Sequence, residues 1–260
     1  MKNKVKRVVE EITEVLKGWE NVECVVLQHF AEKEIFDPNF SITLDVFRTA
    51  EIPDMNEREK AFSVLNGFEF FESSRVGNKD RFIKEELPVR ISYKDTFRVD
   101  AVLSAVNGDA WLSMERGTYL FHRIATGTVV FSRSRWMEGV LEKLDNLPDS
   151  FWHTWLDSCE RRIDHYLGDL GAAAMKDDPL YFRLSLSGFL SVAVEALFAI
   201  NHVFETGPRD FTAMLALLEI LPEGFWANWN SLLREDSELP AERKWKIAEL
   251  VARGIFSLNT

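Results

Sequence analysis

Two aspartates stand inside segments that otherwise predict β-strands. Asp45 lies in ITLDVF and Asp100 lies in FRVDAVL. Aspartate is unfavourable in the interior of a strand. If the two strands were neighbours, both carboxylates would point at one place, and Mg²⁺ takes such oxygen ligands while it keeps waters and substrate phosphates. The pair therefore predicts either a magnesium site or two carboxylates that face solvent on an uncovered side of a sheet.

The elements that would position these aspartates are mixed in the first half of the chain. Apolar residues recur at helical spacing in 4–18, whereas 22–30 and 40–48 are rich in alternating or β-branched residues and predict strands. Residues 97–105 alternate in the same way and predict a third strong strand, which carries Asp100. The remaining segments predict a short helix (56–67), strand-like pieces around the polar turn SSRVGNKD, a helix (109–123), a strand (127–134) and a helix (135–147).

The character of the chain changes near Leu147 and Pro148. From Asp149 onward every segment predicts a helix, and residues 180–204 are apolar nearly all round, as in a central buried helix. We therefore expect an α+β fold in which residues 1–147 form a small mixed β-sheet with helices. An all-helical bundle formed by residues 148–260 follows it.

This order of elements resembles the nucleotidyltransferase superfamily typified by DNA polymerase beta and kanamycin nucleotidyltransferase. In that family a Gly-Ser pair ends the first strand, a D-x-D motif lies on the next strand, and a third aspartate lies on a later strand. His29 and Phe30 stand at the Gly-Ser position, Thr43 and Asp45 at the D-x-D position, and Asp100 at the third. The resemblance implies Mg²⁺-dependent transfer of a nucleotidyl group from a nucleoside triphosphate to an acceptor hydroxyl, with these residues in the site.

The resemblance extends to the helical half and carries clear departures. The segment VEALFAINHVF is similar to the C-terminal part of an uncharacterised group of prokaryotic nucleotidyltransferase-like proteins. His29 and Phe30 carry bulk that obstructs the close backbone approach a Gly-Ser pair allows. Thr43 is neutral where a carboxylate would help to hold two divalent ions. A replacement carboxylate could come from the intervening loop, which contains Glu32, Glu34 and Asp37.

Two functional hypotheses follow from these matches and departures. The first is a magnesium-dependent nucleotidyltransferase that uses Asp45 and Asp100. The second is a catalytically depleted protein of the same fold that binds a nucleotide or a partner protein as a regulator, because a fold does not by itself imply an activity.

Cationic residues supply candidates for phosphate binding. Arg75 and Lys79, with Arg81 and Lys84, fall in SSRVGNKDRFIK. Beside an acidic site they could hold phosphates, the arginines as forks and the lysines as point charges; otherwise they belong to an ordinary charged hairpin. A second set, for which scattered surface positions are expected, consists of Arg116, Arg123, Arg133 and Arg135.

One carboxylate lies in the most apolar predicted helix. Glu195 needs a partner there, because a buried unpaired charge is costly. Arg161 and Arg162 are the candidates for that partner across the helix interface. A position facing the substrate is the alternative reading.

Composition narrows the classes of function. Asp and Glu number 42 against 31 Lys and Arg, which gives a net charge of −11 and argues against general nucleic-acid binding. Two cysteines provide neither a disulfide framework nor a zinc ribbon. The N-terminal residues lack the apolar run of a signal peptide, and the apolar stretch 189–200 is short for a membrane span. We therefore expect a cytoplasmic protein without a membrane partner.

Overall fold

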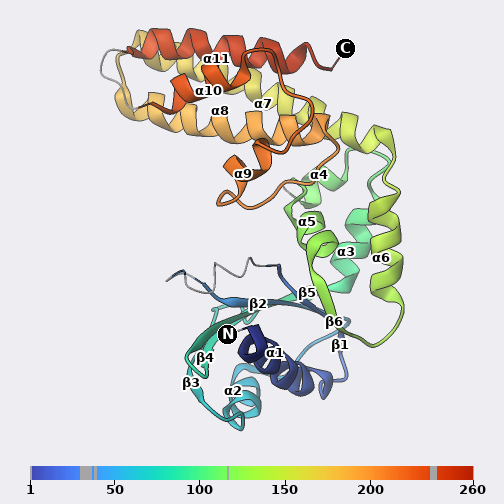
Figure 1. Cartoon of the computed structure of the whole chain (residues 1–260). Helices are drawn as coiled ribbons and strands as arrows, with labels where there is room; N and C mark the ends of the chain where they lie inside the picture. The colour runs from blue at the N-terminus through green and yellow to red at the C-terminus, as the bar shows by residue number, and fades with distance from the viewer. Residues whose placement is uncertain (1, 30–36, 38–39, 116, 235–238, 260) are drawn as a thin grey trace. The chain divides into compact units, whose positions relative to one another are not determined.

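The computed structural model describes the chain except for residues 1, 30–36, 38–39, 116, 235–238 and 260. The chain divides into two compact units, Met1–Ser104 with Arg123–Leu147, and Ala105–His122 with Pro148–Thr260. The first unit contains a six-stranded mixed sheet with helices, and the described elements of the second are helices (Figure 1). The predicted α+β fold class is confirmed.

The sheet has the strand order β3-β4-β5-β2-β1-β6. Strand β2 lies at its centre, antiparallel to β1 and parallel to β5, and the other neighbouring strands are antiparallel. The strands are β1 (Val22–Leu27), β2 (Ile42–Arg48), β3 (Phe68–Ser73), β4 (Lys79–Lys84), β5 (Leu87–Asp95) and β6 (Thr128–Ser132).

The first face of the sheet forms the core of this unit. Helices α1 (Lys2–Lys17) and α2 (Met55–Ser63) lie against it (Figure 1). Ile42, Leu44 and Val46 of β2 are buried there. Because side chains alternate along a strand, Thr43, Asp45 and Phe47 point to the second face.

The second face is covered over part of its area. Phe47 packs on Trp136 of α6 (Trp136–Asp145), with their ring centroids 5.4 Å apart. Over β4 and β5 the side chains of Arg81 and Arg90 are exposed. We call the part of the second face formed by β4, β5 and β2 the open face.

Residues 97–105 do not form the predicted third strand. Helix α3 (Thr96–Ser104) takes their place, and the strand beside β2 is β5, which ends one residue before the helix begins. Val99, Val102 and Leu103 are buried at helical spacing, whereas Phe97 is 80% exposed. In an alternating strand, Phe97 and Val99 would lie on the same face and would be buried together. The observed burial follows the spacing of a helix instead, which explains why this segment is helical.

The segment 109–123 also differs from its prediction. It holds two short helices, α4 (Trp111–Met114) and α5 (Tyr119–Thr126), in place of one. Trp111 and Phe121 both pack against Phe151, with Trp111 stacked at 4.6 Å. These contacts explain why residues 105–122 group with the helical unit, although the sequence places them in 1–147.

The helical unit is built around two long helices, α7 (Asp149–Met175) and α8 (Pro179–Ile200). They pack along each other, and both contact α11 (Ala241–Phe256). Two shorter helices complete it, α9 (Phe211–Leu215) and α10 (Phe225–Leu233). Among the described residues, α8 is the one helix long and apolar enough to cross a membrane. However, 56% of its apolar window is buried inside the unit, as expected of a core helix.

Candidate functional site

Asp45 lies at the centre of β2 with its side chain fully buried. Arg123 binds both of its carboxylate oxygens, with Nε to Oδ2 and Nη2 to Oδ1 each at 2.8 Å. Gln28 donates to Oδ2 at 2.9 Å, and Nζ of Lys94 lies 3.2 Å from the same oxygen. Asp45 is therefore the acceptor at the centre of a cationic cluster.

This arrangement does not fit Mg²⁺. The ion requires near-octahedral oxygen ligands with positions left for water and substrate, whereas Oδ2 already serves Arg123, Gln28 and Lys94. The charges of Arg123 and Lys94 also lie a few ångströms from this carboxylate, and positive charges at such a distance repel a divalent ion. The geometry makes Asp45 the anionic partner of two side chains instead of a metal ligand.

A glycine allows Arg123 to reach the sheet. Residues 123 and 127 lie at the end of α5 and just before β6. A Cβ atom at Gly127 would stand 2.2 Å from Cγ1 of Val26 and 2.9 Å from the carbonyl oxygen of Arg123. A larger residue would therefore push the end of α5 away from β1 and from Asp45.

Asp100 lies on α3, so the prediction that Asp45 and Asp100 occupy adjacent strands is wrong. Its carboxylate oxygens accept from the indole Nε1 of Trp136 at 3.1 and 3.2 Å. The same Trp136 packs on Phe47 of β2. The contacts of Asp100 thus fasten α6 to α3, which is a structural use of the carboxylate.

The strand that does adjoin β2 presents no carboxylate beside Asp45. Register pairs Thr43 with Arg90 and Asp45 with Ser92 of β5, and Lys94 follows on the same face. Among the residues that the structure describes, no group of three or more histidine, cysteine or acidic side chains is arranged to hold a metal ion. The second acidic ligand that the family resemblance implies is therefore missing from this part of the sheet.

The other residues of the Gly-Ser and D-x-D positions are placed as follows. His29 is exposed beyond the end of β1, and Phe30, Glu32 and Glu34 lie outside the described residues. Thr43 faces the same side of β2 as Asp45 and lies near the hydroxyl of Ser41 at 3.3 Å. Thr43 and Asp45 lie two residues apart on one face of β2, as the two aspartates of a D-x-D motif would. Their hydrogen-bond partners, however, are not those of metal ligands.

The predicted basic hairpin is separated by the sheet into two groups. Arg75, Lys79 and Arg81 are exposed, and their role in nucleotide binding stays a prediction. Lys84 is instead fully buried on the first face, where its ammonium lies 2.8 Å from Glu11 and bonds the carbonyl oxygen of Asn66. Alternation along β4 sends Lys84 to the face opposite Lys79 and Arg81, which excludes it from their group.

In the second cationic set, Arg133 and Arg135 are exposed, as expected, whereas Arg123 is partly buried. Arg123 is bound to Asp45, and Arg133 donates to the carbonyl oxygens of Lys17, Trp19 and Val22. Arg135 is exposed and pairs with Glu138. Arg116 lies outside the described residues.

A buried ion pair that the sequence analysis did not identify fixes the hairpin of β3 and β4. The guanidinium of Arg58 on α2 donates to both oxygens of Asp80 at 2.8 and 3.1 Å, and to the carbonyl oxygen of Pro53 at 2.7 Å. The hydroxyl of Tyr93 donates to Asp80 at 2.7 Å. Burial and the negative charge of Asp80 raise the pKa of Tyr93 well above its ordinary value, so the phenol stays a donor.

The helical unit contains a second cluster of titratable groups. Arg162 donates to Glu195 at 2.6 Å, which confirms one of the two predicted partners. Burial raises the pKa of Glu205 to about 7, and the charge of Glu195 adds to this, whereas a backbone hydrogen bond from Thr118 and the charge of Arg162 oppose it. The sequence gives no local signal for Glu205, because its environment is assembled from residues far apart in the chain.

The two cysteines are buried free thiols. Burial raises the pKa of Cys24 to about 12, and burial also raises that of Cys159. Both thiols are therefore protonated at neutral pH and are poor nucleophiles.

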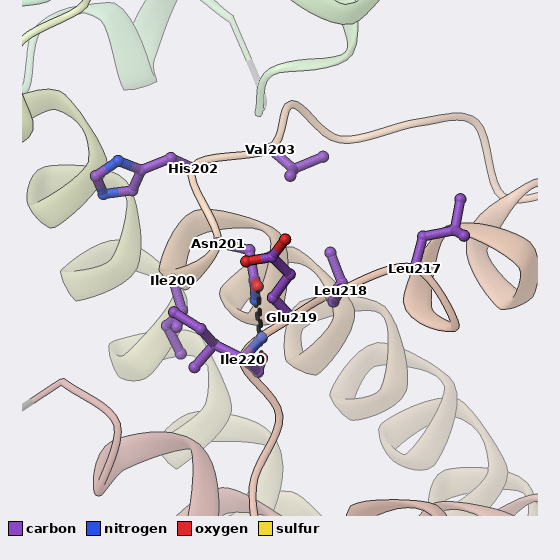
Figure 2. Close-up of a pocket in the computed structure, with 8 residues that line it drawn as sticks. All are labelled: Ile200, Asn201, His202, Val203, Leu217, Leu218, Glu219 and Ile220. Atoms are coloured by element: carbon purple, nitrogen blue, oxygen red, sulfur yellow. Dashed lines mark hydrogen bonds between the residues drawn. The ribbon is translucent and has the colours of Figure 1, made fainter.

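A hollow of about 650 Å³ lies in the helical unit between residues 200–203 and 217–220 (Figure 2). The amide of Asn201 bridges its walls, because Oδ1 accepts from the backbone of Ile220 and Nδ2 donates to the carbonyl oxygen of the same residue. These bonds tie the C-terminal end of α8, where Asn201 lies, to the segment that contains Ile220. The hollow contains none of the residues that the family resemblance assigns to the nucleotide site.

Comparison with known proteins agrees with this fold. No family model matches the sequence, and no curated protein matches it. Among solved structures, the chain is similar to the crystal structure of a nucleotidyltransferase-like protein from Exiguobacterium sibiricum 255-15, with a TM-score of 0.51 and 13% identity. The match covers 99% of this chain and 74% of the other. The chain therefore has the fold of a nucleotidyltransferase-like protein, as the order of its elements predicts.

Proposed function

We propose that this protein is a catalytically depleted member of the nucleotidyltransferase-like fold, which binds a ligand or partner as a regulator. The supporting observation is the double neutralisation of Asp45 by Arg123 and Lys94. A residue aligned with a metal ligand of the family is used here as a buried ion-pair partner. Transfer from a nucleoside triphosphate to an acceptor hydroxyl has no metal-binding carboxylate pair to support it among the described residues.

Among the residues that the structure describes, no second carboxylate lies beside Asp45 on β5, which supports the same proposal. On the open face, β5 places Arg90 and Ser92 beside β2, and Lys94 on the same strand contacts Asp45. This chemistry favours anionic ligands over cations. A nucleotide is thus proposed as a bound ligand, not as a substrate, in a protein that we place in the cytoplasm.

Pyrophosphate release from each of the common nucleoside triphosphates tests the proposal directly. We expect no release above background with Mg²⁺ or Mn²⁺, and no rise in melting temperature on addition of millimolar Mg²⁺ alone. Asp100→Asn is the matched variant, because it removes one aligned carboxylate without disturbing Asp45. Metal-dependent release by the wild-type protein that this variant abolishes would contradict the proposal.

A further inference from the structure

Two arginines face each other across neighbouring strands of the open face. Register places Arg81 of β4 directly opposite Arg90 of β5. Pro88 has no N–H group and lies opposite Ile83, and the Tyr93 backbone donates to Asn78 at 2.9 Å. These contacts make Arg81 and Arg90 a non-hydrogen-bonded pair, the kind in which side chains are closest.

The pairing is unfavourable unless an anion lies between the two side chains. Like charges directly opposite each other in a sheet are destabilising. Arg81 and Arg90 are both exposed, and within the described part of the chain no ion pair joins either of them to an acidic side chain. Their closest acidic neighbour by register is Glu72 of β3, which lies opposite Arg81 on the side of β4 away from β5.

The surrounding residues extend this pair into two rows, which we call the cation rows. Thr43 of β2 adjoins Arg90 in the first row. In the second row, Lys79 lies opposite Ser92, and Asp45 beyond it is already neutralised. Two residues along a strand span about 7 Å, so the rows are about that far apart.

We infer that the cation rows bind an oligophosphate, a chain of two or more linked phosphates, directly and without a metal ion. The inference rests on the proposed function, since it requires a face that does not hold Mg²⁺. Guanidinium forks match phosphate oxygens in a bidentate manner, and the hydroxyls of Thr43 and Ser92 add neutral donors. A single phosphate reaches one row, whereas a linked chain engages both.

Charge around the rows favours a compact ligand over a long nucleic acid. Glu72 borders the rows on the side of β3, and the chain as a whole carries a net charge of −11. A long polyanion would meet that charge beyond the rows and be repelled. An oligophosphate, free or as the tail of a nucleotide, ends within them.

The absence of a metal requirement gives the inference its sharpest consequence. Mg²⁺ in solution binds oligophosphates and neutralises them. If the cation rows contact the phosphates directly, added Mg²⁺ competes with the arginines and weakens binding. A metal-bridged site would show the opposite dependence.

Calorimetric titration of the full-length protein in EDTA at low salt tests this. The probes are tripolyphosphate, pyrophosphate and ATP. We expect saturable binding of tripolyphosphate that weakens with salt and with Mg²⁺. Equal affinity for ATP means that the protein reads the phosphate chain alone, and tighter binding of ATP adds a contact to the nucleoside; both results support the inference.

Single substitutions assign the binding to the rows. Arg81→Gln and Arg90→Gln should each weaken tripolyphosphate about tenfold, the scale of one charge-assisted contact. Arg161→Gln on α7 removes an equally exposed arginine and should leave the affinity unchanged. Arg90→Gln relieves repulsion without removing a charge opposite an acidic residue, so its melting temperature at low salt should equal or exceed that of the wild type. Loss of binding in this variant therefore cannot reflect misfolding.

Several results would overturn the inference. They are no binding of tripolyphosphate or ATP in EDTA, binding that appears only with Mg²⁺, affinity unchanged in both row variants, or preference for a long single-stranded oligonucleotide over tripolyphosphate. Lack of binding would leave the proposed absence of nucleotidyl transfer standing. Metal-dependent pyrophosphate release would instead contradict the proposed function itself.

Discussion

The carboxylate of Asp45 contacts both Arg123 and Lys94, and an Asp45→Asn substitution removes its negative charge. We expect Asp45→Asn to lower the free energy of unfolding by about 3–5 kcal/mol, the cost of leaving buried partners of an ion pair uncompensated. Urea denaturation measures this. Arg123→Met should be partly compensatory in the double variant, because it removes one of the two cations that contact residue 45. A stability unchanged by Asp45→Asn would contradict the role assigned to the cluster.

Thr43→Asp tests whether the D-x-D alignment has functional meaning. On that alignment alone, the added carboxylate should create affinity for a divalent ion and should destabilise the metal-free protein. The structure instead places residue 43 beside Arg90 and surrounds Asp45 with cations. We therefore expect no Mg²⁺ binding by calorimetry, and a change in unfolding free energy within about 1 kcal/mol, as for other partly exposed ion pairs. Measurable Mg²⁺ binding would restore the metal-site reading.

The partners of Asp45 could not be predicted from sequence for a physical reason. Arg123 follows it by 78 residues and is delivered by the end of a helix that Gly127 allows to approach β1. No local spacing reports such a contact. The unusual position of an aspartate within a strand was a correct signal that Asp45 has partners, but it did not distinguish a metal ion from an arginine.

At the scale of elements, the hairpin that carries Lys79 and Arg81 depends on Arg58. Arg58→Met should cost about 3–5 kcal/mol, because Asp80 would remain buried without its cation. The exposed Arg75→Met in the turn of the same hairpin is the matched control and should stay within about 0.5 kcal/mol. Urea denaturation of both variants decides between an anchoring role and an incidental contact. Equal effects of the two substitutions would contradict the anchoring role.

Two elements with strong apolar patterns were predicted correctly. Residues 40–48 alternate and contain β2, and the continuously apolar segment 180–204 overlaps α8. Residues 97–105 fit both a strand and a helix. Val99 and Leu103 are four residues apart, so they share a face in a strand of period 2 and also in a helix of period 3.6. The real neighbour of β2, Leu87–Asp95, also alternates, and the sequence indicates a strand-like piece there. Its pairing with β2 could not be predicted, because a local pattern does not encode which strands lie side by side.

At the scale of the whole molecule, net charge conceals the distribution of charge. A value of −11 excludes a generally basic protein, yet the open face gathers Lys79, Arg81 and Arg90 on adjoining strands. Register, which composition does not encode, brings them together. Acidic residues also gather elsewhere, for example in the cluster of Glu195 and Glu205 in the helical unit.

That acidic cluster makes the stability of the protein depend on pH. The pKa of Glu205 is about 7 in the folded chain, above its ordinary value of 4.5. A carboxyl group with a raised folded pKa favours folding while it is protonated, so its contribution is present below about pH 4.5 and is lost as the pH rises through about 7. Allowing for its partial exposure, we expect a loss on the order of 1–2 kcal/mol across that window.

Glu205→Gln isolates this contribution, because glutamine can still accept the hydrogen bond from the Thr118 backbone but does not ionise. The variant should match the wild-type protein near pH 5 and should exceed it in unfolding free energy by on the order of 1–2 kcal/mol near pH 8. Histidines titrate over part of the same range, but they do so in both proteins, so the difference between the two curves belongs to Glu205. Urea denaturation at intervals across the window gives both curves. Parallel curves would show that Glu205 ionises equally easily in the folded and unfolded chains, and that burial beside Glu195 does not govern its charge.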